Sequence, residues 1–207
     1  MIPLLVEFSK KTVVIFGGGD VGARKAAYFA PEAKVHVYSR SFSPAFSGLD
    51  VEKELIDLHG AGDERLPSLL KGAFLAVAAT PDRELNNRIG ELCQERGILF
   101  NNAEGISGDL LIPSVVKGER FLLAVSTGGS SPAISRFLRE FLEKSLPDLD
   151  RMIALQERLR AYLKECQPDT EARKDVLWKV LMDREVWRAL HAGETAAWSL
   201  IARRYLQ

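Results

Sequence analysis

Residues 13–27 read VVIFGGGDVGARKAA, and this stretch decides the fold of the chain. A β-branched and aromatic run ends in three consecutive glycines, and a helix-like segment follows. Gly17, Gly19 and Gly22 form the pattern G-x-G-x-x-G. In this pattern the first glycine permits a tight turn, the second lets the backbone approach a diphosphate, and the third packs helix against strand. The N-terminus of the helix also favours an anion. The stretch predicts a dinucleotide-binding loop; the alternative is a glycine-rich turn that binds nothing.

The composition describes a balanced chain of 207 residues, with 28 lysines and arginines against 28 aspartates and glutamates. This balance gives no overall field that would favour nucleic acid or an anionic membrane. Cys93 and Cys166 stand alone, which is typical of a reducing compartment and argues against a metal site built from cysteines. No apolar stretch reaches the roughly 18 residues that span a bilayer. We expect a cytoplasmic protein that binds neither nucleic acid nor membrane.

Strand and helix patterns alternate through the first half of the chain. The run AFLAVAA is apolar throughout, which suits a strand in the middle of a parallel sheet that is covered on both faces. The β-α alternation predicts a Rossmann-type α/β fold with right-handed crossovers. We expect strands at residues 12–16, 34–39, 73–79 and 98–101, and helices at residues 19–30, 63–71 and 82–96.

The pattern changes after Asn102, where two strands separated by Lys-Gly-Glu predict a hairpin. The loop TGGSSP follows, and its proline suits the first turn of a helix. The remainder looks helical, and its three tryptophans lie among leucines and valines, so we expect them in a core. The expected elements are strands at 110–116 and 120–126, a helix from Pro132 through Lys144, and helices after Pro147 with breaks near 167–169 and 191–193; the tryptophans are Trp178, Trp187 and Trp198.

The end of the second predicted strand bears on the choice of dinucleotide. A domain that binds NAD usually carries an acid there, which holds the ribose 2′-hydroxyl. This chain has Tyr38-Ser39-Arg40-Ser41 and no acid. Arg40 could pair with a 2′-phosphate, which would favour NADP, it could face an acidic substrate, or it could be an ordinary surface arginine. The sequence leaves the choice between NAD and NADP open.

Several segments together resemble a known family. GGGDVGARKA, the Ala78-Ala79-Thr80 turn, Asn101-Asn102, Ile112-Pro113-Ser114 and VSTGGSSPAISRFLRE occur in the order and spacing of the precorrin-2 dehydrogenase module of sirohaem synthases. The resemblance covers roughly the first 148 residues, and the last of these segments is its most specific part. It implies an NAD(P)-binding Rossmann domain over residues 1–113, a hairpin-plus-helix dimerisation segment over 114–148, and an all-helical domain over 149–207.

The resemblance also implies a reaction and partners. Precorrin-2, a tetrapyrrole with eight carboxylates, gives a hydride to the nicotinamide and becomes sirohydrochlorin. Some members also insert ferrous iron, as ferrochelatases, to give sirohaem. Family members work as homodimers. His36, His59 and His191 lack metal-ligand spacing, so we expect no fixed metal site and regard Fe²⁺ as a substrate.

The family places an aspartate, which acts as a base, a few residues beyond the fourth predicted strand. In this chain the segment FNNAEGISGDLLIPS looks about one residue shorter, and aligning Asn101 with the family's asparagine puts Glu104 at that position. Asp109 is the second candidate for the base, and the alternative is that both are solvated loop acids. The residues expected to contact the cofactor are Gly17, Gly19, Asp20, Val21, Gly22, Arg40, Ser41, Thr80 and Asn102.

Eight carboxylates demand cations or N–H donors. A serine-rich and glycine-rich loop at a helix start suits an anion, and basic residues on the two helices that follow glycine loops could add charge, although such residues are most often the solvated face of a helix. The candidates for substrate binding are Arg24, Lys25, Ser126, Thr127, Gly128, Ser130, Arg136 and Arg139. Two other functions remain open: a non-catalytic module that senses NAD(H), and a dehydrogenase of another polyanionic substrate.

Overall fold

The computed structural model describes residues 2–58, 65–103 and 108–206 of the chain. These residues form two compact units, Met1–Ile112 and Pro113–Gln207. Each unit is described by itself. Residues 114–148 and 149–207 were predicted to form two separate domains. Both segments belong to the second unit, so the boundary between them stays a prediction.

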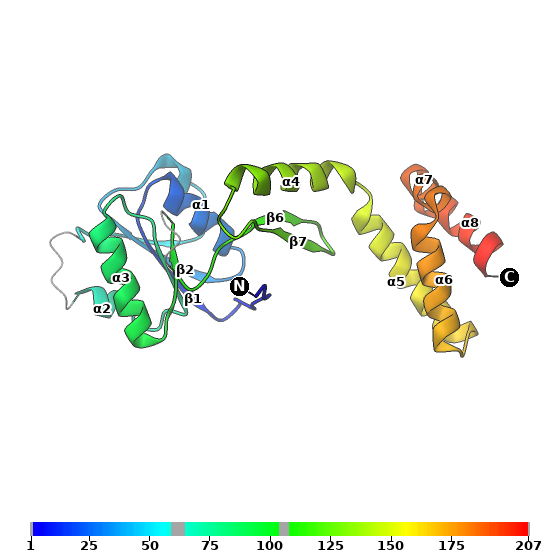
Figure 1. Cartoon of the computed structure of the whole chain (residues 1–207), viewed down its shortest axis with the longest axis horizontal. Coiled ribbons are helices and arrows are strands. Elements are labelled where there is room, and N and C mark those ends of the chain that lie inside the picture. The colour runs from blue at the N-terminus through cyan, green and yellow to red at the C-terminus, as the bar shows by residue number, and fades with distance from the viewer. Residues whose placement is uncertain (1, 59–64, 104–107, 207) are drawn as a thin grey trace. The chain divides into compact units, whose positions relative to one another are not determined.

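The first unit is built around a five-stranded parallel sheet with strand order β3-β2-β1-β4-β5; Figure 1 labels two of its strands, β1 and β2. This arrangement confirms the predicted Rossmann-type α/β fold. β1 lies in the middle, and the chain order reverses between β1 and β4, which is the point where such sheets bind their ligands. The strands are β1 (Thr12–Phe16), β2 (Lys34–Ser39), β3 (Glu52–Leu55), β4 (Leu75–Ala78) and β5 (Leu99–Asn102); the helices are α1 (Asp20–Phe29), the 3₁₀ turn η1 (Pro44–Phe46), α2 (Arg65–Leu69) and α3 (Arg83–Arg96).

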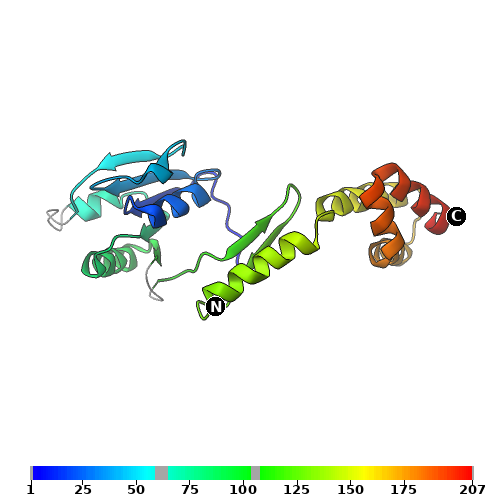
Figure 2. The same ribbon diagram turned by 90° about the horizontal axis from the view of Figure 1, so that it is seen from above.

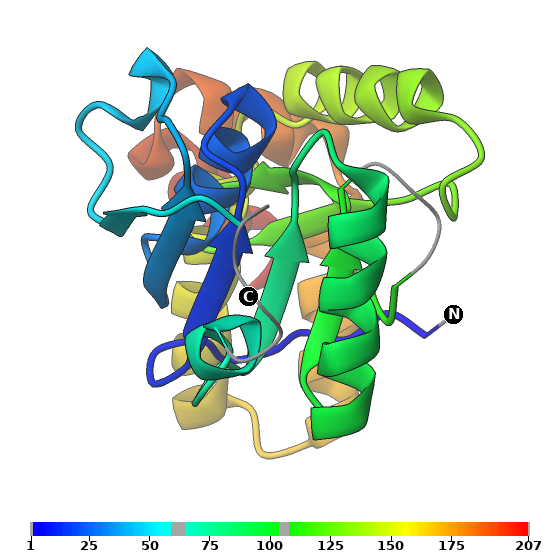
Figure 3. The ribbon, with the colours of Figure 1, turned by 90° about the vertical axis from the view of Figure 1, so that its left-hand side faces the viewer.

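Helices cover both faces of the sheet around β1, and alternate residues of this strand point to opposite faces. Val13 and Ile15 pack with α1 on one face. Val14 and Phe16 pack with α2 and α3 on the other, against residues that include Ile89. Figure 3 shows α3 lying across one face of the sheet. This double cover explains why the central strands are continuous apolar runs.

The β3 strand was not predicted. Its sequence, Glu52–Leu55, is EKEL, and every residue in it is exposed. It pairs only with β2, at the edge of the sheet. An edge strand without buried side chains has no apolar periodicity, so the sequence carries no signal for it.

The second unit begins with an antiparallel hairpin that packs against a helix, as Figures 1 and 2 both show. The carboxylate of Asp150 accepts hydrogen bonds from the backbone N–H groups of Glu119 (3.0 Å) and Arg120 (2.8 Å), which ties the hairpin turn to the long helix that begins at Leu149. The elements are β6 (Ser114–Lys117), β7 (Leu122–Val125), α4 (Pro132–Ser145), α5 (Leu149–Cys166), α6 (Thr170–Met182), α7 (Arg184–Ala192) and α8 (Glu194–Tyr205).

Helices α5 to α8 enclose an apolar core that includes Met152, Leu155 and Leu159. Trp187 and Trp198 pack against this core as expected. The same expectation is wrong for Trp178, whose residue surface is 62% exposed. The apolar residues of α6 do not gather on one face of the helix, so a tryptophan among leucines and valines did not reveal the face on which it lies. No helix in the described part of the chain is both long and apolar enough to cross a membrane.

The predicted helical tail also contains a break that the sequence analysis missed. Asp183 ends α6 and serves as the N-cap of α7, where its side chain accepts a hydrogen bond from the backbone N–H of Glu185 at 2.8 Å. Aspartate is a favoured N-cap residue because it satisfies an N–H group that has no partner within the helix. The expected breaks at 167–169 and near Gly193 are present.

Candidate functional site

The loop between β1 and α1 is held by contacts that only glycine permits. Gly17 has φ +121°, and a Cβ there would collide with the backbone carbonyl oxygen of Ala79, beyond the end of β4. A Cβ at Gly22 would in turn collide with the carbonyl oxygen of Gly17. The first and third glycines therefore hold α1 and β4 close to the loop, as the pattern predicts.

Gly19 is different, because its Cβ direction is open. It has φ −78° and ψ −176°, and no heavy atom of the described part of the chain lies within 4 Å of the position of a Cβ. Gly19 is also the N-cap of α1, and no side chain caps this end of the helix. The N-terminus of α1 favours an anion, and a side chain at Gly19 would extend into the open space beside it.

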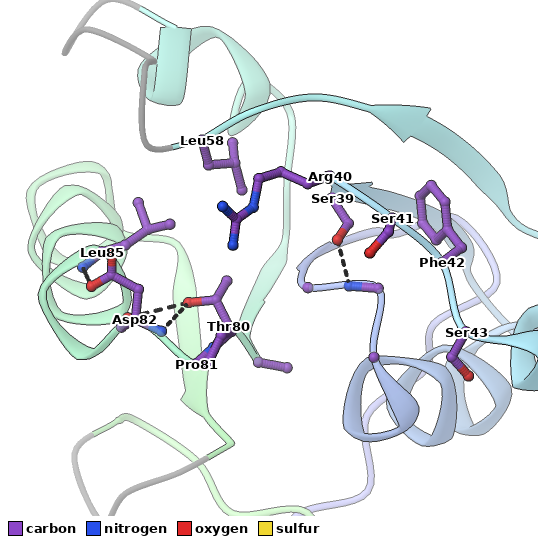
Figure 4. Close-up of a pocket in the computed structure, with 14 residues that line it drawn as sticks. Ser39, Arg40, Ser41, Phe42, Ser43, Leu58, Thr80, Pro81, Asp82 and Leu85 are labelled. Carbon is purple, nitrogen blue, oxygen red and sulfur yellow. Dashed lines mark hydrogen bonds between the residues drawn. The ribbon is translucent and has the colours of Figure 1, made fainter.

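A pocket of about 390 Å³ adjoins this loop, at the carboxyl ends of β1, β2 and β4 (Figure 4). It lies at the point where the strand order reverses, as expected for a dinucleotide site. The lining residues come from the glycine loop, the segment after β2 and the turn after β4. They are Gly17, Gly18, Gly19, Ser39, Arg40, Ser41, Phe42, Ser43, Leu58, Ala79, Thr80, Pro81, Asp82 and Leu85.

The segment after β2 is pinned to the glycine loop. The backbone N–H of Gly18 donates to Ser39 Oγ at 2.9 Å, and the N–H of Ser43 donates to the Gly18 carbonyl at 2.8 Å. A Cβ at Gly18 would collide with the carbonyl oxygen of Ser41. Arg40 and Ser41 therefore stand at the rim of the pocket in a fixed backbone frame.

Other residues expected to contact the cofactor do not line this pocket. Asp20 accepts a hydrogen bond from Ser43 Oγ at 2.6 Å, so its carboxylate is engaged within the protein. Val21 follows it in the first turn of α1, and Gly22 packs behind the loop. Asn102 ends β5, outside the set of pocket residues.

The turn after β4 is locked by a buried polar pair. Thr80 Oγ1 donates to Asn86 Oδ1 at 2.6 Å, and Asn86 Nδ2 donates back to the Thr80 carbonyl at 2.9 Å. Asn86 is 1% exposed. Because its hydroxyl is engaged by Asn86, Thr80 shapes the pocket wall. Thr80 was predicted from the sequence, whereas Asn86 was not, because an asparagine within a helical pattern gives no signal of such a contact.

Asp82 also lines the pocket and was not predicted. Its side-chain Oδ1 accepts hydrogen bonds from the N–H groups of Glu84 (3.0 Å) and Leu85 (3.1 Å), so it caps α3. The aspartate before a helical pattern was the available signal, but its place beside the glycine loop depends on the pairing of β1 with β4.

Of the two candidates for the base, the structure describes only Asp109. Glu104 lies outside the described residues. The Asp109 backbone N–H donates to the Phe100 carbonyl, and its carboxylate accepts from the Phe100 N–H, both at 2.9 Å. Asp109 thus fastens the returning chain to the edge of β5. Nearby, Asn101 is 3% exposed, and its Oδ1 has no hydrogen-bond partner among the residues that the structure describes.

The candidates for substrate binding are divided between the two units. In α1, Arg24 is exposed, and burial, reinforced by the charge of Arg24, lowers the pKa of Lys25. In the second unit, the loop before α4 contains Ser126, Thr127, Gly128 and Ser130. Thr127 Oγ1 accepts from the Ser131 N–H at 3.0 Å, and Ser126 Oγ accepts from the Gly128 N–H at 3.1 Å.

The arginines of α4 make ion pairs along their own helix. Arg136 contacts Glu140 at 2.8 Å, and Arg139 contacts Glu143 at 2.6 Å. Hydrogen bonding by Glu140 raises the pKa of Arg136. These pairs lie on the surface, where an anionic ligand could compete for the arginines. Among residues 2–58, 65–103 and 108–206, no group of three or more His, Cys, Asp or Glu side chains could hold a metal ion.

The strand order, the glycine loop and the pocket together define an NAD(P)-binding domain of the Rossmann class. Residues 4–114 match a family model described as "Putative NAD(P)-binding". The chain is 40% identical over 191 residues to precorrin-2 dehydrogenase of Methanosarcina barkeri, covering 90% of this chain and 85% of the relative. It belongs to the precorrin-2 dehydrogenase family, as the sequence motifs predicted.

Two further comparisons agree with this assignment. Siroheme synthase of Citrobacter koseri is 30% identical over 99% of this chain, which spans 45% of that relative. The solved structure of SirC, precorrin-2 dehydrogenase, superimposes with a TM-score of 0.72 at 20% identity, covering 98% of this chain and 100% of that one. This likeness supports the fold described above.

Proposed function

We propose that this protein oxidises precorrin-2 to sirohydrochlorin with NAD as the hydride acceptor. The observation that carries the proposal is the 40% identity to a precorrin-2 dehydrogenase, which extends over 85% of that protein. The pocket beside the glycine loop supports it, because its open N–H groups fit a diphosphate. The bound nicotinamide would supply the chemistry of hydride acceptance.

The protein must position the substrate and accept a proton. We assign the base to Glu104, which comes two residues after the end of β5 in the sequence; open α/β sheets bind their ligands beyond the carboxyl ends of their strands. Asp109 stands second, because its carboxylate already accepts the Phe100 N–H. In this assignment Glu104 takes the proton that the substrate loses when it is oxidised.

The cofactor roles follow from the pocket. The N–H groups at the start of α1 bind the diphosphate, Gly17 and Gly22 hold that geometry, and Arg40 with Ser41 binds the adenosine ribose. Thr80 shapes the pocket wall, Asn102 is assigned to the cofactor from the carboxyl end of β5, and the first-turn residues Asp20 and Val21 support the loop. The substrate's carboxylates are assigned to Arg24, Lys25, Arg136, Arg139 and the loop residues Ser126, Thr127, Gly128 and Ser130.

We further propose that the chain works as a homodimer through one face of α4. Ile134, Phe137, Leu138 and Phe141 follow helical spacing and form one apolar stripe. Phe137 is 61% exposed and Phe141 is 55% exposed, and their rings stack at 6.2 Å. The face is therefore suited to burial against a second copy. The two free cysteines support a cytoplasmic location.

One assay tests the function. Purified protein is mixed with precorrin-2 and NAD, and the absorption spectrum of sirohydrochlorin is followed, with a reaction lacking NAD as the control. Turnover supports the proposal. Binding of NAD without turnover would contradict it and favour an NAD(H)-sensing module. Iron insertion is a separate activity, which the same reaction tests when Fe²⁺ is added after sirohydrochlorin has formed.

A further inference from the structure

We propose that the dinucleotide site binds NADP at least as tightly as NAD, with Arg40 and Ser41 holding the 2′-phosphate of the adenosine. This inference rests on the proposed function, because it concerns the same pocket. It goes beyond it by assigning a second cofactor and the residues that would read it.

The first argument is the residue that replaces the usual acid. Phe16, the last residue of β1, pairs with Tyr38 in β2, so Ser39 lies beside the first glycine of the loop. An NAD-specific domain places a carboxylate here, which holds the 2′-hydroxyl and repels a 2′-phosphate. In this chain the position carries a hydroxyl, and Ser39 Oγ accepts the Gly18 N–H at 2.9 Å. The site therefore lacks the group that would exclude NADP.

The second argument is the charge of the pocket wall. Two of the lining residues belong to the charged residue types, Arg40 and Asp82. The carboxylate of Asp82 is engaged by the N–H groups at the start of α3. Arg40 is exposed and makes no hydrogen bond or ion pair with a residue that the structure describes. Figure 4 shows its side chain reaching from the segment after β2 toward Thr80 on the opposite wall.

The third argument is the chemistry of the neighbouring groups. Ser41 lines the same rim as Arg40 and adds a hydroxyl donor. A guanidinium with an adjacent hydroxyl suits a phosphate, because arginine donates several charge-assisted hydrogen bonds in a planar fork. The rim backbone is held by the Ser43 N–H bond to Gly18 at 2.8 Å. The binding groups are thus supported by the same loop that holds the diphosphate.

The test measures binding to the whole chain by titration calorimetry, with NAD, NADP, 5′-AMP and adenosine 2′,5′-bisphosphate as probes. We expect NADP to bind at least as tightly as NAD, and the bisphosphate to bind more tightly than 5′-AMP. Arg40→Ala should weaken NADP at least tenfold and weaken NAD by a clearly smaller factor, because only NADP carries the 2′-phosphate. Arg83→Ala removes an exposed arginine of α3 that does not line the pocket, and it should change neither affinity.

A second variant restores the missing acid. Ser39→Asp should keep NAD affinity and weaken NADP at least tenfold, because a carboxylate can still accept the Gly18 N–H but repels the phosphate. The inference is overturned if native protein binds NADP tenfold more weakly than NAD, or if Arg40→Ala weakens both dinucleotides equally, as stacking on adenine would predict. It is also overturned if Arg40→Ala alters only the KM for precorrin-2. If neither dinucleotide binds, the proposed function fails as well.

Discussion

Replacing Gly19 by valine should remove dinucleotide binding and leave the first unit folded. The φ of −78° and ψ of −176° at Gly19 suit any residue, and no protein atom lies within 4 Å of the new Cβ. The expected cost to folding is the weaker N-cap, about 0.5–1 kcal/mol. In the pocket, the added methyl groups would keep the diphosphate from the N–H groups of α1. Each charge-assisted hydrogen bond lost is worth about 1.5–3 kcal/mol, which corresponds to roughly tenfold to a hundredfold in the dissociation constant.

Gly22→Ala provides the contrast. The new Cβ would collide with the backbone carbonyl oxygen of Gly17. Neither the helix that carries the Cβ nor the turn that carries this oxygen can move without disturbing its packing. Overpacking of this kind typically costs about 1–3 kcal/mol of unfolding free energy. Gly22→Ala should therefore lower stability clearly, and Gly19→Val should do so slightly at most. Gly19→Thr, which has the shape of valine and caps a helix better, should bind no dinucleotide and unfold like the native protein.

Calorimetry with NAD measures binding, and urea unfolding followed by far-ultraviolet circular dichroism measures stability. Tryptophan fluorescence is unsuitable for the first unit, because all three tryptophans lie in the second. Native-like affinity in Gly19→Val, within twofold, would refute the assignment of the diphosphate to this loop. An undiminished unfolding free energy in Gly22→Ala would refute the argument from packing.

Further outcomes are expected elsewhere in the chain. Glu104→Ala should lose at least tenfold in turnover and keep NAD affinity, because a general base contributes ~10²–10⁴ in rate; an unchanged rate would reject the assignment. Phe137→Glu should convert a dimer to a monomer in sedimentation measurements, and a native protein that is already monomeric would refute the α4 interface. Asn86→Ala leaves buried groups of the turn after β4 unpaired, so urea unfolding should show a loss of about 1–3 kcal/mol. Hydrogen bonding by His191 lowers the pKa of Asp148, so the charged carboxylate stabilises the second unit above about pH 4 and this stabilisation is lost in more acidic solution. In His191→Ala the acid-dependent loss, followed by tryptophan fluorescence, should be smaller; an equal loss would exclude this contact as its source.

The sequence pattern was sufficient to predict a strand or helix where its side chains are buried on one face or on both faces. β1 was predicted over its full length because its apolar residues pack on both faces of the sheet. β3 escaped because Glu52–Leu55 has no buried residue. Trp178 was misplaced because a large apolar side chain does not reveal by its identity alone which face of a helix it occupies.

The parts of the dinucleotide site that are contiguous in the sequence were predictable, and the parts that depend on strand pairing were not. The glycine loop is a contiguous motif, so its residues could be named, and the absence of an acid after β2 was visible in the sequence. Asp82 could not be placed in the pocket, because that requires knowing that β4 lies beside β1. The role of Asp109 depends on pairing with Phe100 across the edge of β5, which no spacing in the sequence encodes.

The collision that any side chain at Gly22 would make with Gly17 has a consequence for how such a site changes specificity. The first turn of α1 and the glycine turn are so close that only a hydrogen atom fits between them. The loop proposed to bind the diphosphate is therefore packed as part of the interior of the domain. The exposed corner around Arg40 belongs to the surface instead. We therefore expect substitutions that change coenzyme specificity to be tolerated around Arg40. The glycine loop behind it should stay the same for every coenzyme.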